Sequence, residues 1–121
     1  MKTKILIVCN MGRIRSRYLA GYLKEKGYST KFGGVSRSAV TRITPKKLKW
    51  ADKIVIVSKN VKKKFYDRYN VPEVEIININ VSDSTRDYPK KYRKEIGVAR
   101  KRFLENHVYP NLRNKIDKKL K

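Results

Sequence analysis

Cysteine is almost absent from this chain of 121 residues, which carries a single thiol at Cys9. One cysteine cannot form a disulfide within the chain. Because the chain also has only one histidine, it has too few cysteine and histidine ligands for a structural zinc site. Long apolar runs are missing as well, because the strongest one near the N-terminus, residues 5–8, is far too short for a membrane span or a signal peptide. We therefore expect a soluble, cytoplasmic protein without membrane contacts.

Acidic side chains are also scarce, since 10 Asp and Glu residues stand against 32 Lys and Arg residues and leave a net charge of +22. A protein with this charge attracts polyanions. Two explanations stay open: a phosphorylated or nucleic-acid partner, or a general enrichment in lysine that makes the whole surface basic. The basic clusters are spread along the chain at residues 46–47, 62–64, 90–91, 100–102 and 118–119.

What the chain does contain is an alternation of strand and helix signals. Apolar, β-branched segments at residues 4–8, 53–57 and 74–79 are typical of buried strands, and a shorter strand is expected at 28–32, stopped by Gly33-Gly34. Strands that alternate with helices form parallel sheets. We predict one domain over the whole chain, with an α/β fold of three layers: a four-stranded parallel sheet with helices on both faces.

The predicted helices have recognisable ends. A helix that begins at Arg15 finishes in a basic last turn followed by a C-cap glycine, Gly27. Thr44 caps a helix that has proline at its first position and runs to about Trp50. Asn60 is the predicted cap of the next helix.

The last third of the chain begins with a polar loop at residues 80–88 and continues as a long basic helical stretch. Pro110 lacks an amide hydrogen and its ring clashes with the preceding turn, so we expect the helix to kink or split there. An apolar stripe that steps by four residues can cover one face of the sheet. Its members are Phe103 or Leu104, then Val108, Leu112, Ile116 and Leu120.

One short segment combines the features of a phosphate site. Cys9 follows the first predicted strand, and Arg15 stands six positions later, where the first helix begins. Open α/β sheets bind ligands at this carboxyl edge, and the amides of a tight loop and of a helix N-terminus attract anions. The residues predicted to curl around a tetrahedral oxyanion are Asn10, Met11, Gly12, Arg13 and Ile14.

The side chains at the two ends of this loop indicate covalent chemistry. The positive field of the loop stabilises a thiolate, so Cys9 is predicted to be an anionic nucleophile, with the Ser16 hydroxyl as a donor to it. Arg15 can bind two phosphoryl oxygens at once and stabilise charge in the transition state. The alternative is that Cys9 is only a small buried residue at the end of a strand, a common place for a free cysteine. The strand before it, the helix after it and the serine behind the arginine favour catalysis.

The motif C-x5-R-S at residues 9–16 resembles the phosphate loop of low-molecular-weight protein tyrosine phosphatases. Segments 33–36, 43–44 and 48–57 are similar to a compact microbial branch of that family. The resemblance implies a phosphatase-I-like fold, no metal or other cofactor, and hydrolysis through a cysteinyl-phosphate intermediate. It also implies a phosphotyrosine substrate, on a protein or as a small phosphomonoester.

The chain departs from the family pattern at two places. Three residues after the nucleophile, where the family usually has asparagine, it has Gly12, which adopts a positive φ without strain but provides no side-chain brace. Larger members carry their general acid in an Asp-Pro-Tyr segment, whereas residues 81–89 read Val-Ser-Asp-Ser-Thr-Arg-Asp-Tyr-Pro. Asp83 follows the fourth strand closely and stands where the compact branch has an aspartate, so it is preferred to Asp87 as the acid. Tyr88 is a candidate for stacking on an aromatic substrate.

Two rival functions are weighed against this one. An arsenate reductase uses the same loop but passes oxidation to further cysteines, which this chain does not have. A basic binding module would hold a phosphate of RNA, DNA or a phosphoprotein in the loop and draw its affinity from the net charge. Binding alone needs no thiol, so the presence of Cys9 favours the phosphatase.

Overall fold

A computed structural model describes residues 2–12, 14–81 and 104–120. Its centre is a four-stranded sheet in the order β2-β1-β3-β4, in which all neighbouring strands run parallel. The strands are β1 (Lys4–Cys9), β2 (Ser29–Gly34), β3 (Lys53–Ile56) and β4 (Glu75–Asn78). The predicted parallel sheet of four strands is confirmed.

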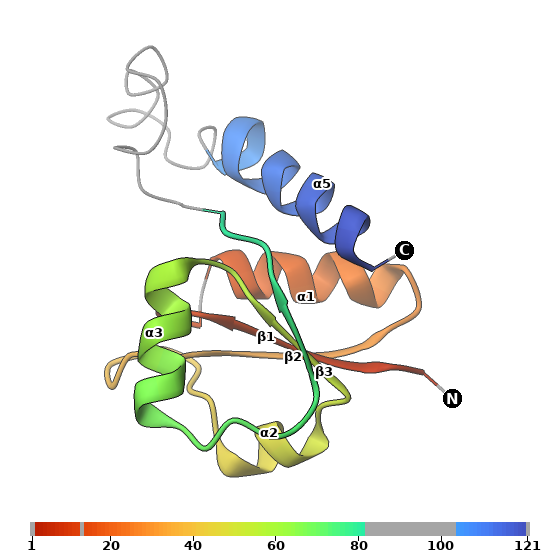
Figure 1. Cartoon of the computed structure of the whole chain (residues 1–121). Helices are drawn as coiled ribbons and strands as arrows, with labels where there is room; N and C mark the ends of the chain where they lie inside the picture. The colour runs from red at the N-terminus through yellow and green to blue at the C-terminus, as the bar shows by residue number, and fades with distance from the viewer. Residues whose placement is uncertain (1, 13, 82–103, 121) are drawn as a thin grey trace.

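Helices cover both faces of this sheet (Figure 1). On one face, α1 (Arg15–Glu25) packs against α5 (Tyr109–Lys119), while α2 (Pro45–Trp50) and α3 (Lys59–Arg68) lie on the other. This distribution follows from the right-handed crossover rule, because the chain moves from β1 to β2 in one direction and from β2 past β1 to β3 in the other. The predicted three layers are confirmed.

The core lies between these layers and centres on the two inner strands. Residues 5–8 and 54–57 are completely buried, as their uninterrupted apolar sequence indicates for strands covered on both faces. The C-terminal stripe joins the core on the side of α1, where Val108, Leu112 and Ile116 are also completely buried. Within the described ranges, no helix is long and apolar enough to cross a membrane.

Two of the three predicted helix ends are observed in the structure. Gly27, with a φ of 102°, closes α1 as predicted, and the Thr44 hydroxyl accepts the predicted capping bond of α2 from the amide of Lys47. The cap of α3 was misplaced in the prediction. Ser58 has an extended backbone and its Oγ accepts from the amide of Val61, whereas Asn60 already lies within the helix.

Pro110 has the effect that its missing amide hydrogen predicts. A π-helical turn, η3 (Leu104–Val108), comes before it, and α5 begins at Tyr109 with the proline in its first turn. Leu104 rather than Phe103 can be assigned to the buried stripe, since Phe103 lies outside the described residues. The helical stretch therefore changes from π-helical to α-helical geometry directly before the proline and continues without a gap.

The prediction that Gly33 and Gly34 stop β2 is wrong. Both belong to the strand, where Gly33 pairs with Val8 and Gly34 pairs with Cys9. Glycine is needed at position 34 because the backbone of Asn10 approaches it closely. A Cβ atom on Gly34 would lie 2.5 Å from the carbonyl oxygen of Asn10. Gly34 thus lets the loop after β1 pack directly on the neighbouring strand, and Gly33 leaves room for Arg42 and Ile43.

Candidate active site

The thiol of Cys9 lies at the carboxyl end of β1, and only 3% of the residue is exposed. Its sulfur accepts a hydrogen bond of 3.0 Å from the amide of Gly12 and lies 2.9 Å from the hydroxyl oxygen of Ser16. Ser16 is completely buried in the first turn of α1. Because a thiolate is stabilised by hydrogen-bond donors directed at the sulfur, this geometry suits a nucleophilic cysteine.

The backbone after Cys9 turns its carbonyl groups to one side. The carbonyl oxygens of Cys9, Asn10 and Met11 accept hydrogen bonds of 2.9 Å from amides of the segment 35–40. A trans peptide unit points its N–H opposite to its C=O, so the amides of the following residues point to the other, concave side. The amide of Gly12, which reaches the sulfur, has this orientation. The loop thus forms an anion cradle with the thiol at its base.

Gly12 is required at its position for two reasons. Its φ is 64°, the positive value that the sequence predicts and that favours glycine. A Cβ atom at this position would also collide with the carbonyl oxygen of Thr41. That oxygen is held in place by a hydrogen bond of 2.7 Å from the amide of Gly34. Backbone from a neighbouring segment therefore occupies the space in which an asparagine side chain would brace the loop.

Arg15 begins α1, and its side chain is almost completely buried. Its Nη1 donates a hydrogen bond of 2.7 Å to the carbonyl oxygen of Val81. The amide of Val81 in turn donates to the carbonyl oxygen of Val57, which follows β3. The guanidinium therefore lies at the same carboxyl edge of the sheet as Cys9. The bond to the Val81 carbonyl helps to orient the planar guanidinium, whose fork of donors matches two oxygens of a phosphoryl group.

The remaining predicted site residues divide into two groups. Asn10 lies at the rim of the cradle, where its Oδ1 accepts a hydrogen bond of 3.3 Å from Lys64 Nζ of α3. Ile14, the residue before α1, lines a groove on the side of α5. Met11 contributes its carbonyl group to the contact with the segment 35–40. Arg13, Asp83, Asp87 and Tyr88 lie outside the described residues, so their roles stay predictions.

Sequence reasoning missed several residues that shape this site. Gly34 allows the close approach behind the cradle, Val81 orients the arginine, and Lys64 contacts the rim. Only Gly34 has a visible signal in the sequence, the Gly33-Gly34 pair, and that signal was interpreted as the end of a strand.

Over the described ranges, no group of three His, Cys, Asp or Glu side chains is placed to hold a metal ion.

The loop amides, the buried thiol and the arginine lie together at the carboxyl edge of a parallel sheet, an arrangement that can bind an oxyanion next to a nucleophile. No family model matches the sequence, and no curated protein sequence is similar enough to count as a relative. Among solved structures, the YwlE arginine phosphatase from Geobacillus stearothermophilus is similar, with a TM-score of 0.56 and 17% sequence identity. The alignment covers 97% of this chain and 94% of that chain. The likeness shows a shared α/β fold over almost the whole length.

Proposed function

We propose that the protein is a cysteine-dependent phosphomonoester hydrolase that acts through a cysteinyl-phosphate intermediate. The observation that carries this proposal is the position of Cys9 Sγ, which accepts a hydrogen bond from the Gly12 amide and lies 2.9 Å from Ser16 Oγ at the base of the cradle. A module that only bound phosphate would need the amides and the arginine but no thiol. The fold shared with a phosphatase supports the same chemistry.

In the first step, the Cys9 thiolate attacks the phosphorus atom in line with the leaving oxygen. The S–P bond forms as the P–O bond breaks, while Arg15 and the loop amides hold the three remaining oxygens and stabilise their charge. Asp83, the predicted general acid, gives its proton to the leaving oxygen. The products of this step are the dephosphorylated alcohol or phenol and the cysteinyl phosphate.

In the second step, water releases the phosphate. Asp83, now a carboxylate, accepts a proton from the water as its oxygen attacks the phosphorus atom. The new P–O bond forms as the S–P bond breaks, and the electron pair returns to Cys9. The Ser16 hydroxyl, which lies 2.9 Å from the sulfur, donates a hydrogen bond to the departing thiolate.

The proposed substrate is a cytoplasmic protein phosphorylated on tyrosine. Phosphoarginine is the second candidate, because the similar solved structure is an arginine phosphatase. Both substrates carry the phosphoryl group on a planar group at the end of a long side chain, but the first requires cleavage of a P–O bond and the second of a P–N bond. Peptides that differ only in the phosphorylated residue separate them by their kcat/KM values.

We also propose a polyanionic partner, RNA or an acidic protein surface, because of the net charge of +22. Binding to heparin or RNA should weaken steeply as the salt concentration rises, since counterions are released from the polyanion. Absence of binding at low salt would instead favour a general enrichment in lysine.

The decisive experiment for the main proposal measures p-nitrophenyl phosphate hydrolysis by the wild type and by Cys9→Ser. We expect the variant to keep its fold and lose turnover, because a serine hydroxyl is a much weaker nucleophile than a cysteine thiolate. Phosphate, sulfate or vanadate should also protect Cys9 from alkylation by filling the cradle. Equal turnover in the two proteins, or alkylation that ignores saturating oxyanion, would contradict the proposed function.

A further inference from the structure

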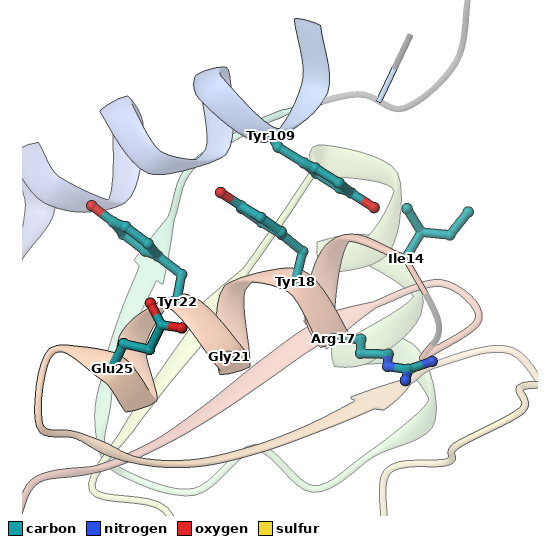
Figure 2. A pocket seen from close by; sticks show the side chains of 7 residues that line it. All are labelled: Ile14, Arg17, Tyr18, Gly21, Tyr22, Glu25 and Tyr109. Carbon is teal, nitrogen blue, oxygen red and sulfur yellow. The ribbon is translucent and has the colours of Figure 1, made fainter. Parts of the chain in front are cut away.

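A groove of about 480 Å³ runs along α1 on the side that faces α5. Figure 2 shows the side chains that form it. Three roughly parallel tyrosine rings make one wall, Gly21 leaves the helix backbone bare, and Arg17 and Glu25 lie toward opposite ends. The lining residues are Ile14, Arg17, Tyr18, Gly21, Tyr22, Glu25 and Tyr109.

The tyrosine wall is held rigid by stacking and by hydrogen bonds. The rings of Tyr18 and Tyr109 stack with centroids 3.9 Å apart and an interplanar angle of 1°, and Tyr22 continues the row. The Tyr18 hydroxyl oxygen accepts a hydrogen bond of 2.6 Å from Arg113, and the Tyr22 hydroxyl donates to Asp117 at 2.7 Å. A wall that is ordered before a ligand arrives loses little conformational entropy on binding.

Gly21 keeps the space above the helix open. It lies in the interior of α1, where glycine destabilises a helix relative to alanine. A Cβ atom at this position would meet no other atom within 4 Å, so neither packing nor backbone geometry requires a glycine. A close approach of another molecule to the helix backbone is a physical reason for its absence of side chain.

The charges at the two ends of the groove are uncompensated within the described part of the chain. Arg17 and Glu25 are exposed, and neither forms an ion pair or a side-chain hydrogen bond there. Ile14, at the near end, belongs to the loop of the phosphate cradle. From Ile14 to Glu25 the helix rises about 16 Å, at about 1.5 Å per residue. An extended peptide needs roughly five residues to cover that length.

We propose that this groove binds the polypeptide segment adjoining the phosphorylated residue of a protein substrate. The inference rests on the proposed phosphatase function. The segment lies along α1 with an apolar side chain over Gly21 against the tyrosine wall. An acidic side chain near the phosphorylated residue pairs with Arg17, and a basic one further along pairs with Glu25. A small phosphomonoester occupies only the cradle, so the groove selects proteins and peptides as substrates.

The test fills the groove without removing any contact. The substrates are p-nitrophenyl phosphate and the phosphotyrosine peptide KALE-pY-ELAK, which reads the same from both ends because the chain direction in the groove is open. For Gly21→Leu we expect kcat/KM on the peptide to fall about tenfold, with hydrolysis of p-nitrophenyl phosphate unchanged. Gly21→Ala is the graded control: it should raise the melting temperature, leave hydrolysis of p-nitrophenyl phosphate unchanged and lower kcat/KM on the peptide less than Gly21→Leu does. Equal effects of Gly21→Leu on the two substrates, or no effect on the peptide, would contradict the proposal that the groove binds the substrate.

Charge provides a second readout at Glu25. The peptide with both terminal lysines replaced by glutamate should be a poorer substrate for the wild type than its parent, and Glu25→Gln should reduce that preference. Binding of the labelled parent peptide to Cys9→Ser, with and without Gly21→Leu, tests the groove without turnover. If the wild type hydrolyses neither substrate, the proposed function fails. If Cys9→Ser/Gly21→Leu binds the peptide as tightly as Cys9→Ser does, the proposal that the groove binds the substrate is wrong, whatever the activity of the wild type.

Discussion

Nη1 of Arg15 donates a buried hydrogen bond of 2.7 Å to the carbonyl oxygen of Val81, 66 residues further along the chain. The bond joins the first turn of α1 to the segment that follows β4. Asp83, the predicted general acid, comes two positions after Val81. The residue that clamps the phosphoryl group in the proposed mechanism therefore also fixes the point from which the acid-bearing segment departs.

Replacement of Arg15 by lysine should lower kcat for p-nitrophenyl phosphate by about 10²–10³-fold, because an ammonium group cannot hold two phosphoryl oxygens and the Val81 carbonyl together. Steady-state kinetics measure the loss of kcat, and a thermal melt measures the effect of the lost Val81 contact on stability. The control is Arg37→Lys, which changes an exposed arginine in the same way. Retention of wild-type kcat in Arg15→Lys would remove the arginine from the mechanism.

Gly12→Asn should destabilise this chain although asparagine is the residue usual in the family that the loop resembles. The Thr41 carbonyl oxygen occupies the position of the new Cβ, so the loop must shift; we expect a loss of about 1–3 kcal/mol in the free energy of unfolding, together with loss of activity. Urea titration measures the first effect. Gly27→Asn is the matched control, since that glycine also has a positive φ but open space around it. Equal costs at both positions would show that φ alone, and not the collision, matters.

Asp83→Asn should slow the hydrolysis of phenyl phosphate or phosphotyrosine by about 10²-fold and that of p-nitrophenyl phosphate much less, because a nitrophenolate departs almost unaided. Paired kinetics on the two leaving groups measure the difference. Asp87→Asn should change both rates little. The reverse pattern would transfer the role to Asp87, and no leaving-group dependence in either variant would place the proton donor elsewhere.

The contact between α1 and α5 should weaken in acid. Lys26 lies 2.7 Å from Asp117, and its hydrogen bond, with a second one from Tyr22, lowers the pKa of the Asp117 carboxyl in the folded protein. A lowered folded-state pKa contributes stability that is present above the unfolded value of about 3.9 and is lost as the pH falls through the folded value.

Asp117→Asn should therefore lower the melting temperature at pH 7 and leave it nearly unchanged at the acid end of the range. The shift should be small, because about 40% of each side chain of the Lys26–Asp117 pair is exposed to solvent. Asp67→Asn, at an exposed position on α3, serves as the control. A difference between wild type and Asp117→Asn that is the same at both pH values would show that titration of this carboxyl contributes nothing.

The amino-acid sequence determined those features that depend on neighbours along the chain. The apolar residues 5–8 and 54–57 mark strands buried on both faces, and Thr44 and Gly27 mark the ends of helices. The candidate site was predictable to the same extent, because Cys9 and Ser16 belong to one strand-loop-helix unit whose local geometry brings sulfur and hydroxyl together.

Only the tertiary structure decided the contacts that cross between elements. Gly34 lies behind the cradle rather than ending a strand, and Val81 orients the arginine, because parallel strands bring their carboxyl ends to a single edge of the sheet. The stack of Tyr18 on Tyr109 likewise depends on which face of the sheet α5 covers. These contacts leave no local pattern in the sequence, because each residue fits the helix, strand or loop to which it belongs whatever it contacts. Which residues meet depends on the strand order and on the hand of the crossover connections.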